Sequence, residues 1–134
     1  MALKVELKPG ERFILGESVI TNDSQRTRLF IEGTTPILRE KDILLPENAR
    51  TPCERIYVVI QTMYLSADPK DQHAAYFDLV KDVVRAAPSA LPYIEAVNNE
   101  ILTGSLYKAL KKTQALIAYE RELLDHAKCG TGVR

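Results

Sequence analysis

Short apolar runs separated by turn-forming residues fill positions 3 to 43 of the chain. At the start, Leu3, Val5 and Leu7 alternate with charged residues. This two-residue period is typical of a strand with one buried face. The Pro9-Gly10 pair that follows predicts a turn. The opening of the chain is therefore expected to form β-structure.

Four more short strands are expected before residue 44. They are predicted at residues 13–15, 19–20, 26–32 and 37–41. The polar segment 22–25 favours a turn, because its side chains can bond their own backbone. Five strands of this length carry too few apolar side chains for a stable sandwich. The small sheet is therefore expected to pair with a second copy or to be covered by the rest of the chain.

Four helices are expected after a connector at residues 44–50, which contains proline and has no clear period. The sequence thus predicts an α+β chain, with a small antiparallel β unit over residues 1–45 and a helical unit over 46–134. The first helix has the most specific start signal, Thr51-Pro52-Cys53-Glu54. In such a capping box the Thr51 hydroxyl accepts from the Glu54 amide, while the Glu54 carboxylate reaches back. Proline suits the first helical position.

The other helices are placed by caps and by apolar residues at helical spacing. Asp68-Pro69 predicts the start of the second helix, which should end near Ala86. The third begins at residue 89 or 90, Gly104 suits its C-terminal cap, and Ser105 begins the fourth. The residues expected to face the core are Ile56, Val59, Ile60, Met63, Tyr64, Phe77, Val80, Val83, Val84, Ile94, Val97, Ile101, Leu106, Leu110, Thr113, Ile117 and Leu124.

The charge balance argues against strong nonspecific attraction to nucleic acid. Lysine plus arginine and aspartate plus glutamate number 18 each, and residues 1–50 contain eight of each sign. A neutral chain exerts no overall pull on a polyanion. A local basic face could still bind phosphates, since such contacts depend on where the charges lie.

Cysteine usage and hydropathy predict a cytoplasmic protein. The sequence has two cysteines, Cys53 and Cys129, with no signal peptide and no apolar run of about eighteen residues. His126 and Cys129 are three residues apart, which could place two metal ligands on one helical turn. Two ligands are too few for a site, so a polar tail without a metal or another cofactor is expected there.

Catalytic patterns are weak. Cys53 lies near a helix N-terminus, where its pKa could be lowered, and His73 or His126 could serve as its base. The alternative is that Cys53 packs in the core, and its apolar neighbours favour this. The six glycines are scattered singly and form no phosphate-binding loop. No enzymatic activity is expected.

Taken whole, the chain resembles the FlbT family of flagellum-biosynthesis repressors of alphaproteobacteria. The first forty-odd residues separately resemble CsrA, a small bacterial regulator of mRNA translation and stability. The residues that carry the second resemblance are Pro9-Gly10-Glu11, Ile14-Leu15-Gly16-Glu17, the strand from Arg28 to Gly33, Pro36, Arg39-Glu40 and Ile43. The first resemblance covers nearly every residue, and the second covers about a third.

The resemblance implies a protein that binds the 5′ untranslated region of flagellin mRNA and lowers its translation or promotes its decay. In CsrA-like proteins the first and last strands lie together and grip RNA, with an arginine of the last strand as a main contact. Arg39 matches that arginine. The chain departs from the CsrA pattern at Leu7-Lys8, where basic residues are usual, and at Leu38, where a histidine is usual.

Five basic side chains are candidates for RNA contact: Lys4, Lys8, Arg26, Arg28 and Arg39. An arginine can bond phosphate twice or stack on a base. Arg26 and Arg28 are two apart, so they should share one face of a strand. The alternative is a surface strand whose charges pair with Glu6, Glu11 and Glu40.

A second functional class remains open. The four amphipathic helices carry more apolar surface than one small sheet face can cover, which predicts association, including a possible homodimer. The helices could then act as a protein-interaction adaptor for a flagellar regulator or for flagellin. The resemblance to FlbT makes FlaF, an opposing regulator, a reasonable partner.

Overall fold

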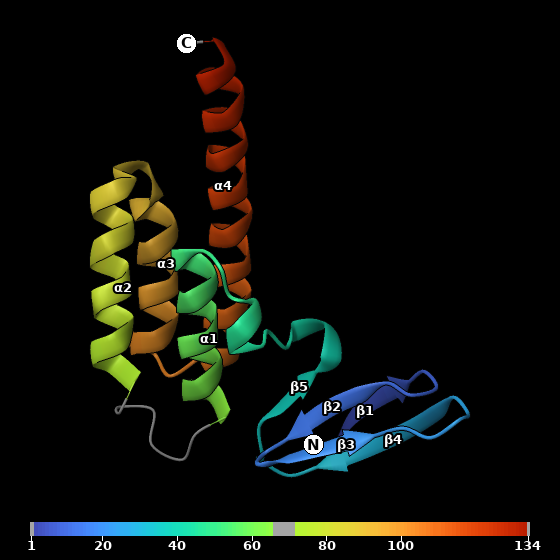
Figure 1. Cartoon of the computed structure of the whole chain (residues 1–134). Coiled ribbons are helices and arrows are strands. Elements are labelled where there is room, and N and C mark those ends of the chain that lie inside the picture. Colours follow the sequence, from blue (N-terminus) through green and yellow to red (C-terminus); the bar gives the residue numbers. More distant parts are fainter. Residues whose placement is uncertain (1, 66–71, 134) are drawn as a thin grey trace. The chain divides into compact units, whose positions relative to one another are not determined.

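The computed structural model describes residues 2–65 and 72–133, with the side chains of 3–65 and 72–126. The chain divides into two compact units, Met1–Ile43 and Leu44–Arg134, called here the sheet unit and the helical unit. The elements are β1 Ala2–Leu7, β2 Arg12–Leu15, β3 Ser18–Thr21, β4 Thr27–Glu32, β5 Ile37–Arg39, α1 Pro52–Leu65, α2 His73–Ala86, α3 Leu91–Leu102 and α4 Leu106–Val133 (Figure 1). The predicted α+β fold class, with five strands before four helices, is confirmed.

The five strands form two antiparallel sheets. Strand β1 pairs with β4, with Ala2 opposite Glu32 and Leu7 opposite Thr27. Strand β2 lies between β3 and β5 in the second sheet. Strands β1 and β5 are therefore not hydrogen-bonded to each other, although the resemblance to CsrA implies that the first and last strands lie together.

Two differences between the predicted and observed strand boundaries affect candidate site residues. Strand β5 ends at Arg39, because Glu40–Asp42 turn into a short 3₁₀ helix in which the Ile43 amide donates to the Glu40 carbonyl. Strand β4 begins at Thr27, so Arg26 lies in the loop before it. The expected shared strand face of Arg26 and Arg28 is therefore wrong.

A small apolar core holds the sheet unit together. Val5, Leu7 and Phe13 are almost fully buried. The partly buried residues that pack against them are Leu15, Ile20, Leu29, Ile31 and Ile37. The predicted alternation along β1 is confirmed for Val5 and Leu7, whereas Leu3, nearer the end of the strand, is 47% exposed.

Gly16 joins β2 to β3 in a conformation that favours glycine. Its φ of 62° lies in the left-handed region. A Cβ at this position would also lie 2.8 Å from Cγ2 of Thr35. Both the backbone angle and the close approach therefore explain the glycine that ends the predicted strand.

The predicted capping box begins helix α1. The Glu54 amide donates to the Thr51 hydroxyl, and the Thr51 amide donates to Oε1 of Glu54, each at 3.2 Å. The Arg50 amide also donates to this carboxylate oxygen, at 2.9 Å. These bonds lower the pKa of Glu54, led by the Arg50 amide, with Arg121 close enough to add to the effect.

The ends of α2 and α3 agree with the sequence. Helix α2 ends at Ala86 as predicted, while its expected start at Asp68-Pro69 lies outside the described residues. After α3, Gly104 adopts a φ of 80° and its amide donates to Ile101, while the Ser105 amide donates to Glu100. These two bonds form a Schellman cap. The predicted glycine cap is confirmed.

Two large residues that were expected to face the core of the helical unit are exposed instead. Phe77 and Leu124 are 50% and 48% exposed. Tyr76 faces inward in place of Phe77, with its hydroxyl bonded to Asn98, and burial raises the pKa of Tyr76 to about 12. The buried side chains of this unit include Cys53, Ile56, Tyr57, Ile60, Met63, Tyr76, Val83, Ile94, Val97, Ala109, Leu110, Thr113 and Leu116.

Leu124 is exposed because of the length of α4. This helix has 28 residues, twice the 14 of α1. Its C-terminal part extends past the other helices of the unit (Figure 1). The apolar spacing of α4 therefore continues beyond the residues that can be buried by α1 and α3.

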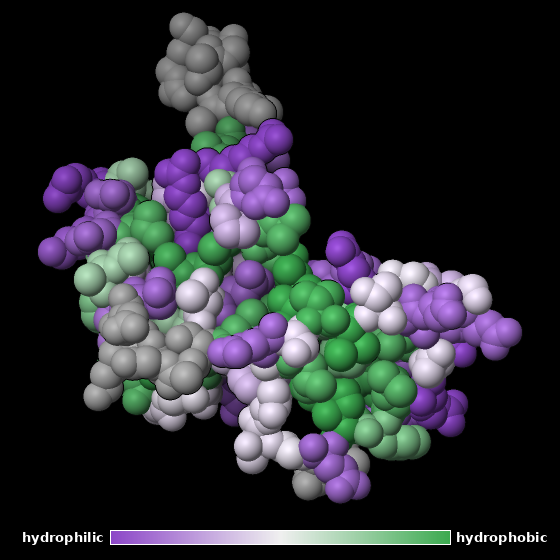
Figure 2. All heavy atoms as spheres, turned by 60° about the horizontal axis from the view of Figure 1, so that its bottom comes forward, coloured by the Kyte–Doolittle hydropathy of each residue, from purple (hydrophilic) through white to green (hydrophobic). Residues whose placement is uncertain are grey.

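Apolar side chains reach the surface of both units, among hydrophilic ones, as Figure 2 shows. The most exposed large ones are Leu102 at 81%, Phe30 at 67% and Val19 at 62%. Among the described helices, none is both long enough and apolar enough to span a bilayer. Phe30 is the exposed aromatic ring of the sheet unit and is accessible to a ligand.

Candidate nucleic-acid interface

Arg39 links the two sheets of the sheet unit. It belongs to β5 and is half-buried, and its Nη2 donates to the carbonyl oxygen of Lys4 in β1 at 3.4 Å. Among the described residues, no carboxylate forms an ion pair with Arg39. The structure therefore brings Arg39 beside Lys4 even though their strands are not paired.

Lys4 and Arg28 lie on the solvent-facing side of the β1–β4 sheet. Lys4 Nζ is 3.5 Å and Arg28 Nε is 3.4 Å from the same oxygen, Oε1 of Glu6. All three side chains are more than half exposed. Exposed ion pairs of this kind contribute about 0–1 kcal/mol. Both cations can therefore exchange Glu6 for another anion at small cost.

Phe30 shares this face and was missed as a site residue. It lies directly opposite Lys4 in the sheet register, and it is two positions along β4 from Arg28. Its ring is 67% exposed. Exposed aromatic rings flanked by basic residues are typical stacking platforms for single-stranded nucleic acid. The alternation along β4 was the signal that could have placed Phe30 outward.

Lys8 lies at a polar hollow of about 320 Å³ beside the Pro9-Gly10 turn. The hollow is lined by Lys8, Pro9, Gly10, Glu11, Glu40 and Lys41. Both acidic residues have partners: Glu11 accepts from the Lys8 amide at 2.8 Å, and Glu40 pairs with Arg12 at 3.4 Å. Two lysines thus line the hollow, and the two carboxylates that line it with them each have a partner.

Lys41 is a second residue that sequence reasoning missed. It was expected at the end of a strand, whereas it lies in the 3₁₀ helix Glu40–Asp42. This turn places Lys41 at the same hollow as Lys8. Arg26 is exposed in the loop before β4, apart from the paired strands. The five candidates are thus spread over the sheet unit. Lys4 and Arg28 lie on one face of the β1–β4 sheet, Arg39 links the two sheets, Lys8 lies at the hollow and Arg26 lies in a loop.

Cys53 has the character of a core thiol. It is 2% exposed in the first turn of α1. Burial raises the pKa of its thiol, and the neighbouring carboxylates of Glu120 and Glu54 raise it further. A cysteine nucleophile acts as the thiolate, which these surroundings disfavour. The interpretation of Cys53 as a packed residue agrees with its burial.

The two histidines differ in their surroundings. His73 is partly buried and lies edge-on to Phe77, with ring centroids 6.4 Å apart, and His126 is exposed. Among the described residues, no three His, Cys, Asp or Glu side chains are grouped so as to hold a metal ion. The side chain of Cys129, considered with His126 as a ligand pair, lies outside the described part of the chain.

Comparison with known proteins identifies the family. The family model described as "Flagellar protein FlbT" matches residues 3–124. The chain belongs to the FlbT family. A "Probable flagellum biosynthesis repressor protein FlbT 1" of Bradyrhizobium diazoefficiens is 60% identical over 124 residues, covering 92% of this chain and 85% of the relative. The predicted membership of the FlbT family is confirmed.

Two further FlbT relatives match over almost their full length. The "Probable flagellum biosynthesis repressor protein FlbT" of Rhodopseudomonas palustris is 51% identical over 125 residues, which cover 93% of this chain and 99% of the relative. The "Flagellum biosynthesis repressor protein FlbT" of Caulobacter vibrioides is 35% identical over 134 residues, covering 97% and 94%. No solved structure matches the chain.

Proposed function

We propose that this FlbT-family chain represses flagellum biosynthesis by binding the 5′ untranslated region of flagellin mRNA, and thereby lowers translation or promotes decay of the message. The relatives are named as repressors of flagellum biosynthesis. The observation that carries the RNA step is the position of Arg39, which lies beside Lys4 and has no carboxylate partner among the described residues. An arginine held in this way keeps its charge available for an anion.

The donors of Arg39 support phosphate or base recognition. A guanidinium has five N–H donors, and the bond to the Lys4 carbonyl uses one of them. The remaining donors can bind a phosphate in a forked geometry, and the planar group can stack on a base. Because β5 anchors the backbone of Arg39 opposite Phe13 in the sheet, the guanidinium is positioned before RNA binds.

The electrostatics favour a local interface. The chain has no net charge, so attraction must come from the cations of one surface. Lys4 and Arg28 share the Glu6 carboxylate, and Lys8 lies at the hollow with Lys41. For single strands, the slope of log K against log salt is about −0.7 for each phosphate neutralised. Binding through these residues should therefore weaken steeply as salt rises.

The proposed activity needs no catalysis and no cofactor. Repression follows from occupancy of the leader, or from exposure of the message to nucleases supplied by the cell. Its site of action is the cytoplasm, where mRNA is translated. The buried thiol of Cys53 supports this non-enzymatic interpretation.

A binding titration tests the proposal. Full-length protein is titrated into a fluorescent RNA of the flagellin leader, and anisotropy is measured at low and high salt. Arg39→Ala should weaken binding roughly tenfold, which corresponds to ~1.4 kcal/mol. Arg85→Ala removes an exposed arginine from α2 and is the matched control. Equal affinity of the Arg39 variant and the parent at low salt, with both folded, would overturn the assignment.

A second function, as a protein adaptor for flagellin or a flagellar regulator such as FlaF, is favoured by a pocket of about 550 Å³ in the helical unit. Exposed Leu124 of α4 contributes to its lining. Association through an apolar helix surface should resist salt, unlike RNA binding. Titration of each purified partner against the full chain at two salt concentrations separates the two functions.

A further inference from the structure

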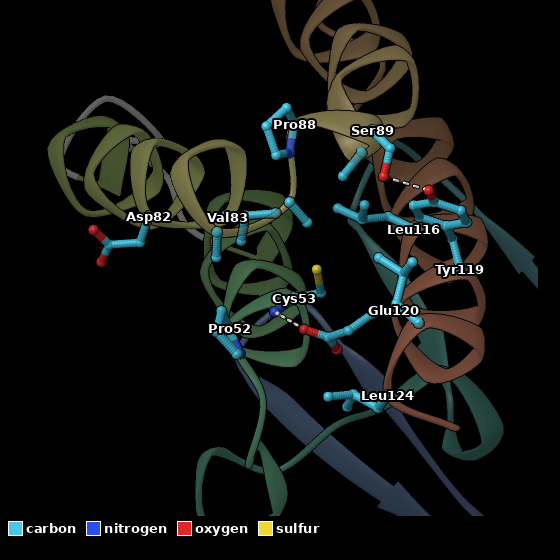
Figure 3. Close-up of a pocket in the computed structure, with 14 residues that line it drawn as sticks. Pro52, Cys53, Asp82, Val83, Pro88, Ser89, Leu116, Tyr119, Glu120 and Leu124 are labelled. Atoms are coloured by element: carbon cyan, nitrogen blue, oxygen red, sulfur yellow. Dashed lines mark hydrogen bonds between the residues drawn. The ribbon is translucent and has the colours of Figure 1, made fainter. Parts of the chain in front are cut away.

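The pocket of the helical unit lies among the start of α1, the end of α2, the 3₁₀ turn Pro88–Ala90 and the middle of α4 (Figure 3). Its volume is about 550 Å³, the size of a small ligand site. Most of the lining is apolar and includes Pro52, Val83, Pro88, Leu116, Leu123 and Leu124. An apolar group is therefore the natural occupant.

Glu120 of α4 brings a carboxylate into this apolar lining. Its Oε2 accepts from the backbone amide of Cys53 at 3.2 Å, at the first turn of α1 (Figure 3). Its Oε1 is buried and has no hydrogen-bond partner among the described residues. A buried acceptor without a partner is unfavourable, because the hydrogen bonds it made with water are not replaced. The pocket thus offers a donor-seeking oxygen, with the weak thiol donor of Cys53 close by.

The other polar groups of the lining do not compete for a ligand in the same way. The Tyr119 hydroxyl donates to the Ser89 hydroxyl at 2.5 Å, so these two are engaged with each other. Asp82 points away from the middle of the pocket in Figure 3. Recognition would therefore combine an apolar body with one hydrogen-bond donor, preferably cationic, at Glu120. An anionic group would be repelled there.

Helix α4 suggests the form of the partner. It continues for nine residues past Leu124, to Val133, and extends beyond the other helices of its unit (Figure 1). Leu124 lies between the pocket and this extension and is 48% exposed. A helix running along α4 could insert one apolar side chain into the pocket. This is the helix-in-groove mode of recognition.

We propose that the pocket binds an amphipathic helix of a partner protein, with an apolar side chain in the cavity and a lysine or arginine donating to Oε1 of Glu120. This inference rests on the second proposed function and supplies its chemistry. Charge complementarity favours a cationic donor on the partner, because Oε1 of the Glu120 carboxylate is buried and has no hydrogen-bond partner among the described residues.

The test uses two synthetic helical peptides with the same leucine face. One carries lysine beside that face, and the other carries glutamate at the same positions. With full-length protein, the lysine peptide should bind at least tenfold more tightly. Glu120→Gln keeps an acceptor for the Cys53 amide and should abolish the preference between the two peptides. Equal binding of both peptides by the parent protein would overturn the proposal.

Leu124→Asp supplies a second variant at an exposed position, where folding should be unaffected. It should weaken binding of the lysine peptide at least tenfold. Leu102→Asp, at an 81% exposed leucine of α3 outside the pocket lining, is the matched control and should bind as the parent does. If the lysine peptide binds the Leu124→Asp variant as tightly as it binds the parent chain, the peptide does not occupy this pocket.

Two further outcomes distinguish failure of the pocket from failure of the adaptor function. If a flagellar protein binds the Leu124→Asp and Glu120→Gln variants as tightly as it binds the parent chain, the adaptor function stands and the proposed use of the pocket is overturned. Sedimentation could also show a homodimer that Leu124→Asp dissociates, while neither peptide binds the parent chain. That result would identify a second copy of the chain as the occupant of the pocket and would overturn the proposed partner.

Discussion

The sheet unit and the helical unit use their polar residues differently. In the sheet unit, an exposed carboxylate oxygen of Glu6 lies 3.5 Å from Nζ of Lys4 and 3.4 Å from Nε of Arg28. In the helical unit, the buried Gln61 amide donates to the Leu44 carbonyl at 3.0 Å and its oxygen accepts from the Leu44 amide at 2.9 Å. The Gln61 side chain thus holds the backbone of the helical unit at Leu44, whereas the exposed ion pairs of Lys4 and Arg28 with Glu6 can be exchanged.

This difference agrees with the separate tasks proposed for the two units. Exposed ion pairs contribute about 0–1 kcal/mol each, whereas loss of a partner in a buried pair costs about 1–3 kcal/mol. A ligand can therefore replace the partners of Lys4 and Arg28 without disturbing the fold. The sheet unit suits reversible binding of an anion, and the helical unit suits a stable packed surface.

The largest expected effect is a cavity in the helical core. Ile60 of α1 is fully buried. Ile60→Ala should lower the free energy of unfolding by ~2–5 kcal/mol, because apolar contacts are lost and a cavity remains. Urea denaturation followed by circular dichroism measures it. Leu102→Ala, at an exposed leucine of the same unit, should change stability by no more than ~0.5 kcal/mol. A similarly small loss for Ile60→Ala would show that Ile60 does not contribute to a packed core.

A smaller effect is expected from Glu54 as pH falls. Its pKa is below the ordinary 4.5, because the Arg50 and Thr51 amides and nearby Arg121 favour the carboxylate. A lowered folded-state pKa stabilises the protein above pH 4.5, and this contribution is lost as pH falls through the folded-state value. Thermal unfolding of the parent and of Glu54→Gln should therefore converge in acid.

The control for this pH series is Glu122→Gln, which removes a carboxylate from an exposed position of α4. Its difference from the parent should stay small throughout the series. A constant stability difference between Glu54→Gln and the parent from neutral to acid pH would show that the capping carboxylate makes no pH-linked contribution.

The smallest effect on stability is expected in the sheet unit, at Glu6. Glu6→Gln removes the shared partner of Lys4 and Arg28 and should change the free energy of unfolding by no more than ~1 kcal/mol. The same change should strengthen binding of leader RNA, because two cations lose a competing carboxylate. Anisotropy titration measures it, with Glu17→Gln as a control at an exposed acid outside this ladder face. Weaker RNA binding by Glu6→Gln would contradict the role of this face.

Local signals predicted the ends of the helices well. The Thr51-Pro52-Cys53-Glu54 box and Gly104 act through bonds within a few residues, so their geometry is encoded in short segments. The strand alternation likewise predicted that Val5 and Leu7 are buried. These features depend little on the rest of the fold.

Pairing and coverage could not be predicted in the same way. Alternation along β1 shows which face is buried but does not identify the partner strand, which is β4. The spacing of α4 includes Leu124 as an apolar position, although α1 is too short to cover it. Among the site residues, the position of Phe30 opposite Lys4 depends on the strand register, which joins residues distant in sequence. Lys41 was missed because a local 3₁₀ turn replaces the end of the predicted strand.

Ultraviolet crosslinking of RNA to the protein in motile cells, followed by sequencing of the recovered transcripts, shows whether the chain binds the flagellin leader through Arg39. The parent chain and Arg85→Ala are expected to recover the flagellin leader, and Arg39→Ala is expected to lose most of it at equal protein abundance. Recovery of the leader at the parent level by Arg39→Ala, or its absence with the parent chain, would show that the chain does not bind the leader through Arg39.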